Sequence, residues 1–370
     1  MTARYLVLRT SQDTAGVPDR CRQWAQRVRA DVAVLGPIGP DDLRARLEHD
    51  DCAGAVLELA RVADDATVAA AIARAAYPVV AVSREAVAGD RSVVEAACAH
   101  VFAGRGTGGF VWGLWHLHAL HEHPPRTMSY GPHPAQVADL RTPVDAARPV
   151  VVLVHGGFWR HEWERDLMDG LALDLSRRGY ATWNVEYRRV GETGGGWPQT
   201  GDDVVRAVTA LTILADDGVD LERVVLLGHS AGAQLALRAA AELRDRGRPP
   251  ALVVALSGLL DLGSAASGGV GWGSVEAFVG AGPEEDPERY RDAAPIAHLP
   301  LGVAQLLAHG TADAHVPPAQ SAGYEDAART AGDHMELARL DDADHFAPID
   351  PTSTAWATIA AAIERRVPPG

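Results

Sequence analysis

The stretch RVVLLGHSAG, residues 223–232, decides the fold of the larger part of this chain. Its apolar run, residues 224–227, is typical of a buried strand, and the residues that follow the stretch have helical spacing. GHSAG, residues 228–232, therefore places a G-x-S-x-G motif at a strand-to-helix turn. The flanking glycines let strand and helix approach without a Cβ clash, and the helix N-terminus favours negative charge at the serine. The motif predicts that Ser230 is a nucleophile on a strained turn.

Two residues farther along the chain have the chemistry that such a serine needs. A serine hydroxyl is a weak nucleophile at neutral pH and requires a base within hydrogen-bond distance. Asp313 and His345 follow expected strands over residues 303–308 and 335–340, so both lie at the carboxyl ends of parallel strands. In the order Ser…Asp…His, His345 is the predicted base and Asp313 the acid that orients it. The alternative acids, which lie too close in sequence to His345 for the usual geometry, are Asp341, Asp342 and Asp344.

A glycine-aromatic motif, HGGFW at residues 155–159, follows a strand expected to end at Val154. Consecutive glycines free backbone N–H groups to point at an oxyanion, together with the N–H of Ala231. Residues 257–300 are expected to form a small lid that selects the substrate. The predicted pocket residues are Trp159, Tyr187 and Trp197. Trp272 is a further candidate to line an acyl or aryl pocket, and packing in the core is the alternative for all three tryptophans.

These motifs together resemble the α/β-hydrolase superfamily over roughly residues 126–366. They are HGGFW (155–159), GHSAG (228–232), HGTAD (309–313) and DHF (344–346). The HGG-aromatic-Trp motif and the stretch YRRVGETGGGWP (187–198) are similar to the branch that contains hormone-sensitive-lipase-like esterases and kynurenine formamidases. The resemblance implies an α/β-hydrolase fold, and by position it implies that Gly157, Phe158 and Ala231 form the oxyanion hole.

We therefore expect a serine hydrolase that cleaves a small-molecule carboxylic ester or amide through an acyl-enzyme. This chemistry requires no metal and no organic cofactor, and we predict none. Two narrower hypotheses remain open: an arylformamidase acting on N-formylkynurenine, and an acyltransferase in which another nucleophile replaces water. The sequence does not separate hydrolysis from transfer.

Strands also alternate with helices in the first third of the chain, which predicts a second, smaller parallel sheet. The expected strands are residues 4–9, 31–36, 53–60 and 78–83, and the chain is expected to be helical from Ser92 onward. A Pro- and His-rich stretch then precedes an expected edge hairpin near Tyr130, Val137 and Leu140. The predicted domains are residues 1–121, a doubly wound α/β unit, and residues 122–370, the hydrolase.

The first domain resembles type II 3-dehydroquinase, which has a flavodoxin-like fold, over residues 55–83 and 91–110. That family needs a tyrosine and an arginine in the first loop, an Asn-Pro-Gly and a histidine. Here residues 10–17 contain neither Tyr nor Arg, residues 58–60 read Glu-Leu-Ala, and Ser83 stands at the histidine position; only residues 91–93, Arg-Ser-Val, remain. We expect a degenerate, non-catalytic domain for assembly or ligand sensing. Because dehydroquinases of this type form large oligomers, the resemblance also implies a homo-oligomer through this domain.

Two other patterns in the first domain have simpler interpretations. The histidines His116, His118, His121 and His123 fit a solvated linker better than a metal site. Gly104, Gly106 and Gly109 match G-x-G-x-x-G. The segment before them is expected to be helical, and Pro124 and Pro125 interrupt the unit that a dinucleotide fingerprint needs, so a turn is expected instead.

Composition limits the possible partners and the compartment. The net charge of -15 disfavours nucleic acid and anionic membranes, because phosphates would be repelled. No apolar run approaches the ~20 residues that cross a bilayer, and the N-terminus does not read as a signal peptide. The widely spaced Cys21, Cys52 and Cys98 fit reduced thiols, so a cytoplasmic protein is expected.

Overall fold

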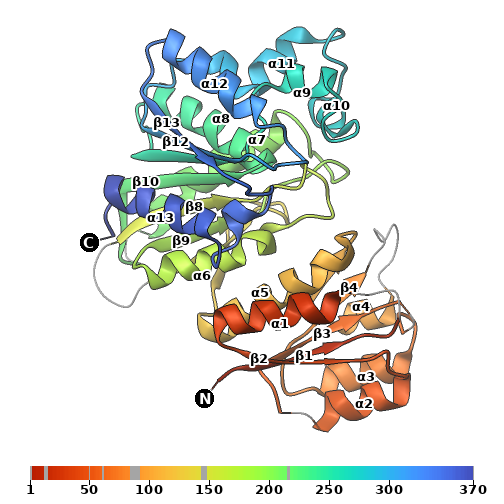
Figure 1. The fold of residues 1–370 in the computed structure, drawn as a ribbon. Coiled ribbons are helices and arrows are strands. Elements are labelled where there is room, and N and C mark those ends of the chain that lie inside the picture. Colours follow the sequence, from red (N-terminus) through yellow and green to blue (C-terminus); the bar gives the residue numbers. More distant parts are fainter. Residues whose placement is uncertain are drawn as a thin grey trace. The chain divides into compact units, whose positions relative to one another are not determined.

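The computed structural model describes residues 2–11, 16–49, 51–60, 62–83, 92–142, 148–214 and 217–369. The chain divides into two compact units, Met1–Pro124 and Pro125–Gly370. Each unit has its own sheet, and Figure 1 labels the elements of both. None of the helices among these residues is long and apolar enough to cross a membrane.

The described part of the first unit is built on a parallel sheet with the strand order β2-β1-β3-β4-β5. The strands are β1 (Arg4–Leu8), β2 (Asp31–Leu35), β3 (Gly54–Glu58), β4 (Val79–Ser83) and β5 (His100–Ala103). The helices are α1 (Val17–Val28), α2 (Pro40–His49), α3 (Ala66–Arg74), α4 (Val93–Ala97) and α5 (Gly109–Glu122), with a short 3-10 turn η1 (Gly106–Gly108). This strand order is that of flavodoxin-like folds.

Alternation along the central strands creates two cores in this unit. Tyr5 and Val7 of β1 pack with α1 and α5 on one face. Leu6 and Leu8 pack with α2, α3 and α4 on the other. Successive side chains of a strand point to opposite faces, so a strand that is apolar throughout must be covered on both sides.

The structure corrects the expectation that the chain is helical from Ser92 onward. Helix α4 ends at Ala97, and β5 follows it as the edge strand of the sheet. The glycine-rich turn at residues 104–109 therefore follows a strand and opens a helix. The linker interpretation of the histidines is also wrong for His118, which is buried on α5 with its Nδ1 3.0 Å from the Tyr5 hydroxyl.

The second unit contains a larger mixed sheet whose described strands have the order β13-β12-β11-β10-β8-β9-β7-β6. The hairpin strands β6 (Arg126–Ser129) and β7 (Val137–Arg141) are antiparallel, and β7 pairs antiparallel with β9 (Ala181–Val185). The parallel strands are β8 (Arg148–Val154), β9, β10 (Val219–His229), β11 (Leu252–Leu256), β12 (Gln305–Gly310) and β13 (Met335–Leu340). The predicted fold class, an α/β-hydrolase fold preceded by a smaller parallel α/β unit, is confirmed.

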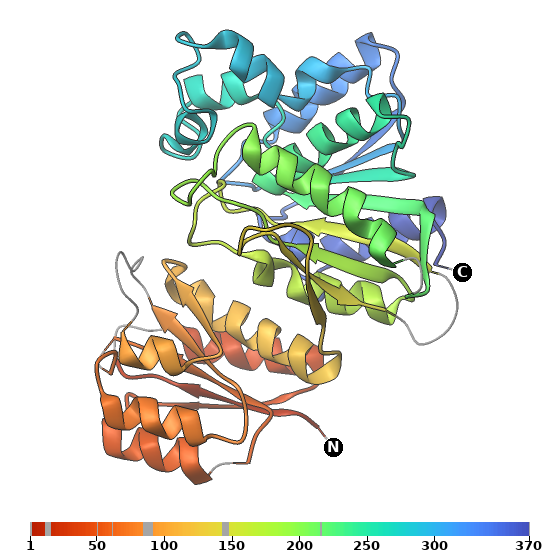
Figure 2. The same cartoon turned by 180° about the vertical axis from the view of Figure 1, so that it is seen from behind.

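Helices cover both faces of this sheet, as Figures 1 and 2 show. One face carries α6 (Asp169–Arg177) and α13 (Thr354–Arg366), which are joined where the Trp356 indole N–H donates to Asp174. The other face carries α7 (Gln199–Thr209), α8 (Ala231–Asp245) and α12 (Ala319–Thr330), which share one core with the strands. Between β11 and β12 the chain forms short helices, α9 (Leu262–Ser267), α10 (Ser274–Val279), α11 (Pro287–Ala293) and the turn η4 (Pro295–His298).

Candidate active site

The turn at Ser230 joins β10 to α8 with a strained backbone. Ser230 has φ 56° and ψ -119°, a conformation that L-residues adopt only where the surrounding structure enforces it. A Cβ at Gly228 would collide with the carbonyl oxygen of Gly232, and a Cβ at Gly232 would collide with that of Val154. Both glycines of the motif are therefore required for the close approach of the strands and α8.

The neighbouring strand fixes this turn from the other side. The Ser230 N–H donates to the carbonyl oxygen of Leu256, the last residue of β11, at 2.8 Å. Ala231 is the first residue of α8, a helix of 15 residues, so its N–H has no partner within the helix. The positive end of the helix dipole thus lies directly behind the Ser230 side chain.

The structure brings Asp313 and His345 together at the carboxyl ends of β12 and β13. His345 Nδ1 lies 2.7 Å from Asp313 Oδ2. The other carboxylate oxygen, Oδ1, accepts hydrogen bonds from the N–H groups of His315 at 2.8 Å and Val316 at 2.9 Å. Burial alone would raise the pKa of Asp313, but the hydrogen bonds from His309 and His345 outweigh it and hold that pKa far below its usual range. The carboxylate is therefore ionised and ready to orient the imidazole of His345.

No hydrogen bond joins Ser230 Oγ to His345 within the described residues. Hydrogen bonds between a nucleophile and its base are often long without substrate and shorten in the complex. Asp344, one of the alternative acids, instead accepts hydrogen bonds from the N–H groups of Phe346 and Ala347 through Oδ1 and closes its own turn.

Two histidines that the sequence analysis did not assign to the site support this pair. His309 Nε2 lies 3.0 Å from the Val316 carbonyl and 3.3 Å from Asp313 Oδ2, while its Nδ1 lies 2.7 Å from Ser321 Oγ. This pattern is satisfied when Nε2 carries the proton and Nδ1 accepts from the serine. The HGTAD spacing of four residues between His309 and Asp313 is the local signal that points to this contact.

His229 lies on the other side of His345. Its Nε2 is 3.0 Å from the His345 carbonyl oxygen, and the two rings are 4.7 Å apart. Burial, and then the charge of His345, lowers the pKa of His229 well below the usual value, so the ring is neutral and Nε2 donates. The variable position of the G-x-S-x-G motif therefore links the serine turn to the backbone of His345.

The HGGFW loop has an uncommon backbone at three successive residues. Gly157, Phe158 and Trp159 have φ values of 108°, 53° and 57°. Trp163 covers Gly157 so closely that a Cβ there would overlap the indole, and a Cβ on Gly156 would lie 2.9 Å from Ser230 Cβ. The N–H groups of Gly157 and Phe158 have no hydrogen-bond partner among the described residues. The HGGFW loop therefore passes directly beside Ser230 and carries two backbone N–H groups that can bind an oxyanion.

A buried carboxylate, Glu186, anchors that loop from behind. Its Oε1 lies 3.1 Å from His155 Nε2, and its Oε2 accepts from the Arg165 N–H at 2.9 Å. The His155 ring is stacked on Tyr187, whose hydroxyl donates to the His155 carbonyl at 2.8 Å. Burial would raise the pKa of Glu186, but His155 and Arg189 more than offset it and lower that pKa.

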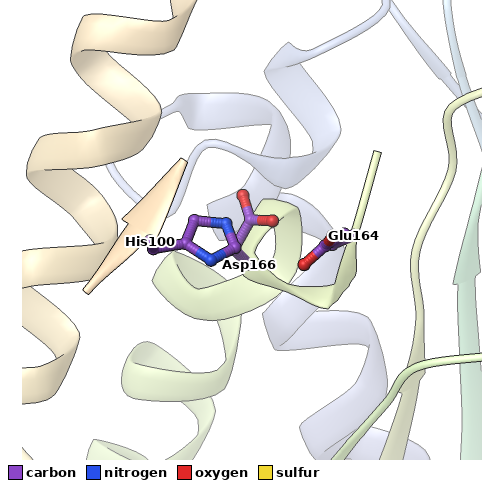
Figure 3. A group of neighbouring side chains, drawn as sticks. All are labelled: His100, Glu164 and Asp166. Carbon is purple, nitrogen blue, oxygen red and sulfur yellow. The ribbon is translucent and has the colours of Figure 1, made fainter. Parts of the chain in front are cut away.

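Arg165, whose N–H donates to Glu186, is the first residue of the turn η2 (Arg165–Met168). Figure 3 shows two side chains near this residue, Glu164 and Asp166, as sticks. Glu164 precedes this turn, and its Oε1 lies 3.3 Å from Arg189 Nη1. The sequence analysis missed Glu186 because nothing local marks it, except that it directly precedes the YRRVG stretch.

The structure buries all three residues that were predicted to line a substrate pocket. Trp159 stacks on Phe278 at 4.0 Å, and its indole N–H donates to Gln234. The Trp197 indole donates to Asp292 at 2.8 Å, and Tyr187 uses its hydroxyl on His155. Lining of the pocket by these residues stays a prediction. Trp272, in contrast, is 80% exposed.

The mixed sheet with its serine turn defines the second unit as an α/β-hydrolase. Similar solved structures include a truncated carbohydrate esterase from gut microbiota, with 18% identity and a TM-score of 0.58 over 65% of this chain and 96% of that one. Carboxyl esterase 2 from the mycorrhizal fungus Tuber melanosporum has 20% identity and a TM-score of 0.56, over 66% of this chain and 88% of that one. A bacterial heroin esterase has 24% identity and a TM-score of 0.55, over 66% and 83%. At these identities the likeness establishes the fold.

The chain belongs to the BD-FAE family, whose model matches residues 138–327. That range begins in β7 and contains the HGGFW loop, Ser230 and Asp313. No curated protein sequence matches the chain.

Proposed function

We propose that this protein hydrolyses carboxylic esters through an acyl-enzyme formed on Ser230. His345 takes the proton of the Ser230 hydroxyl as Oγ bonds to the ester carbonyl carbon. The tetrahedral intermediate collapses, the C–O bond to the alcohol breaks, and His345 returns the proton to the departing alcohol. Water then attacks the acyl-enzyme with the same proton transfers, which releases the acid and regenerates Ser230.

In this proposal the N–H groups of Gly157, Phe158 and Ala231 stabilise the oxyanion. Their support is the pair of unused donors beside Ser230 and the helix N-terminus behind it. Asp313 holds the imidazole and stabilises its charged form. The observation that carries the proposal is the 2.7 Å contact between His345 and ionised Asp313, on the same sheet edge as a serine in a strained turn.

Esters are preferred over amides because the similar structures are described as carbohydrate, carboxyl and heroin esterases. Cleavage of N-formylkynurenine and acyl transfer to another nucleophile are the alternatives. All three use the same acyl-enzyme chemistry and differ in the leaving group or in the group that accepts the acyl.

A panel of p-nitrophenyl esters of rising acyl length, run beside N-formylkynurenine, tests the choice. We expect hydrolysis of one or more esters with a higher kcat/KM than for the formamide. Addition of short alcohols should not divert the acyl group from water. Exclusive activity on N-formylkynurenine would contradict the ester proposal, and a dominant alcohol product would replace hydrolysis by transfer.

For the first unit we propose a degenerate dehydroquinase-like domain over residues 1–121 without chemistry of its own, followed by the hydrolase domain over residues 122–370. Its support is the strand order and Glu58, whose carboxylate accepts hydrogen bonds from Thr10 and Ser11 where the dehydroquinase resemblance requires an asparagine. Conversion of 3-dehydroquinate by the protein would contradict the absence of chemistry in this domain.

We further propose that the first domain forms a homo-oligomer. Residues 126–370 alone should then elute as a monomer, and retention of the full-length oligomeric state would contradict this assembly role.

We propose a cytoplasmic location; the support is that Cys21, Cys52 and Cys98 are free thiols, as is common in a reducing compartment. Burial raises the pKa of both Cys21 and Cys98 to about 12. Such thiols are inert and unpaired, and they pack as small apolar groups.

A further inference from the structure

The segment between α9 and α10 carries an exposed tryptophan. Among the described residues, the large hydrophobic side chains that are exposed are Val93, Ile213 and Trp272, with exposed fractions of 48%, 51% and 80%. Trp272 lies in GGVGWG, residues 268–273, and it has φ 50° between Gly271 and Gly273, which also have positive φ. An exposed side chain buries little apolar area, and a left-handed backbone is strained for a residue other than glycine, so folding alone does not explain this tryptophan.

This tryptophan nevertheless has a fixed place beside the candidate site. A Cβ on Gly271 would lie 2.7 Å from Phe158 Cδ1, so the loop rests directly on the Phe158 ring. The Trp272 and Phe158 rings meet edge to face, with centroids 6.3 Å apart and an angle of 65°. Backbone hydrogen bonds close the loop, from the Ser274 N–H to Gly271 at 3.0 Å and from the Trp272 N–H to Gly269 at 3.4 Å.

Phe158 connects the Trp272 loop to the proposed oxyanion hole. Its backbone N–H is one of the proposed oxyanion donors, and its side chain is the ring that Trp272 touches. A substrate whose carbonyl oxygen binds at the Phe158 N–H is therefore held by the same residue whose ring contacts Trp272. An exposed indole next to a phenyl ring favours a planar aromatic ring as a third partner, because offset and edge-to-face pairs are preferred.

We propose that Trp272 is a specificity-determining residue that binds an aryl ring of the substrate, so that the enzyme prefers aryl-bearing esters. This inference rests on the proposed ester hydrolysis at Ser230. It predicts a preference for a planar aromatic ring over a saturated ring of equal carbon number, because both bury similar area but only the aromatic ring stacks.

Two matched substrate pairs test the proposal with the full-length protein. Methyl phenylacetate and methyl cyclohexylacetate place the ring on the acyl side, while benzyl acetate and cyclohexylmethyl acetate place it on the alcohol side. The variants are Trp272→Ala, which removes the ring, and Trp272→Phe, which keeps one. In wild type we expect the aromatic member of at least one pair to have the higher kcat/KM.

Trp272→Ala should lower kcat/KM for that aromatic ester about fivefold to tenfold, mainly through KM, with less than a twofold change for its saturated partner. Trp272→Phe should retain most of the preference. An equal loss on both members, or no loss, would overturn the proposal, and so would a change of oligomeric state in Trp272→Ala without a change in preference. Ser230 labelling by a small alkyl fluorophosphonate separates the two claims. Labelling without an aryl preference overturns only this inference, whereas no labelling and no hydrolysis of any ester overturn the proposed function with it.

Discussion

The two units use the same parallel α/β design, yet the polar groups at the carboxyl ends of their strands behave differently. In the first unit, Glu58 at the end of β3 is fully buried. Its carboxylate accepts the N–H of Thr10 at 2.8 Å, the N–H of Ser11 at 2.9 Å and the Ser11 hydroxyl at 2.6 Å. In the second unit, Asp313 also accepts two backbone N–H groups through Oδ1, but its Oδ2 contacts the His345 imidazole.

The difference separates a structural carboxylate from one that serves a reaction. Glu58 ties the loop after β1 to β3 and thereby completes the fold. In the second unit the chain of contacts continues from Asp313 to His345, and neither His345 Nε2 nor Ser230 Oγ forms a hydrogen bond within the described residues. Atoms without partners at the sheet edge are what a substrate can use. Substitutions at the site of the second unit should therefore lower activity, whereas substitution of Glu58 in the first unit should lower stability and leave activity unchanged.

The largest effect is expected for Asp313→Asn. The variant removes the negative charge that orients and stabilises the His345 imidazole, and kcat for an ester should fall about 10⁴-fold. Asp342→Asn is the matched control, because Asp342 is exposed, has a positive φ that asparagine tolerates, and is one of the alternative acids. Steady-state hydrolysis should change less than twofold in the control. A larger loss in Asp342→Asn than in Asp313→Asn would mean that the acid is misassigned.

A smaller effect is expected for Glu186→Gln, which weakens the anchor of the HGGFW loop. Glu186 contacts no substrate in this account; it holds His155 and the Arg165 backbone. Because small misplacements of reacting groups are costly, kcat should fall about tenfold to a hundredfold with little change in KM.

Glu192→Gln is the comparison for that variant. Glu192 also pairs with Arg189, at 2.7 Å, but on a more exposed side. Its activity should stay within twofold of wild type, because the Glu192 carboxylate bonds to Arg189 and not to His155 or the Arg165 backbone, and glutamine keeps an oxygen that can accept the Arg189 N–H. Thermal unfolding of both variants checks that each is folded at the assay temperature. Equal losses of kcat in the two variants would show that the anchor does not act through His155.

The smallest effect on activity, and a clear effect on stability, is expected for Glu58→Ala. Two buried backbone N–H groups and one hydroxyl lose their acceptor, which should lower the free energy of unfolding of the first unit by about 2–4 kcal/mol. Glu58→Gln keeps an acceptor oxygen and should lose less. Chemical denaturation followed by tryptophan fluorescence measures the loss, while kcat/KM for esters should be unchanged. A variant that unfolds normally but loses esterase activity would refute the division of roles between the units.

The features that the sequence predicted are those with a local signature. The turn at Ser230 follows from five consecutive residues, and the contact between Asp313 and His345 follows from the parallel direction of the strands that carry them. The short strand β5 was missed because its four residues lie between two helical patterns. Glu186 was missed because its partner His155 is 31 residues away in sequence, and only the folded sheet brings them together. For Trp272 the sequence left a pocket residue and a core residue open, and only its exposure in the folded chain excludes the core.

The central claim, that Ser230 is the nucleophile, is tested most directly by covalent labelling. The full-length protein is treated with a fluorophosphonate, digested, and the modified peptide is identified by mass spectrometry, beside Ser230→Ala. The account predicts that the adduct lies on Ser230, that the variant is not labelled, and that its ester hydrolysis falls about 10⁴-fold to 10⁶-fold while the fold is retained. An adduct on another residue, or labelling and turnover that survive in Ser230→Ala, would contradict it.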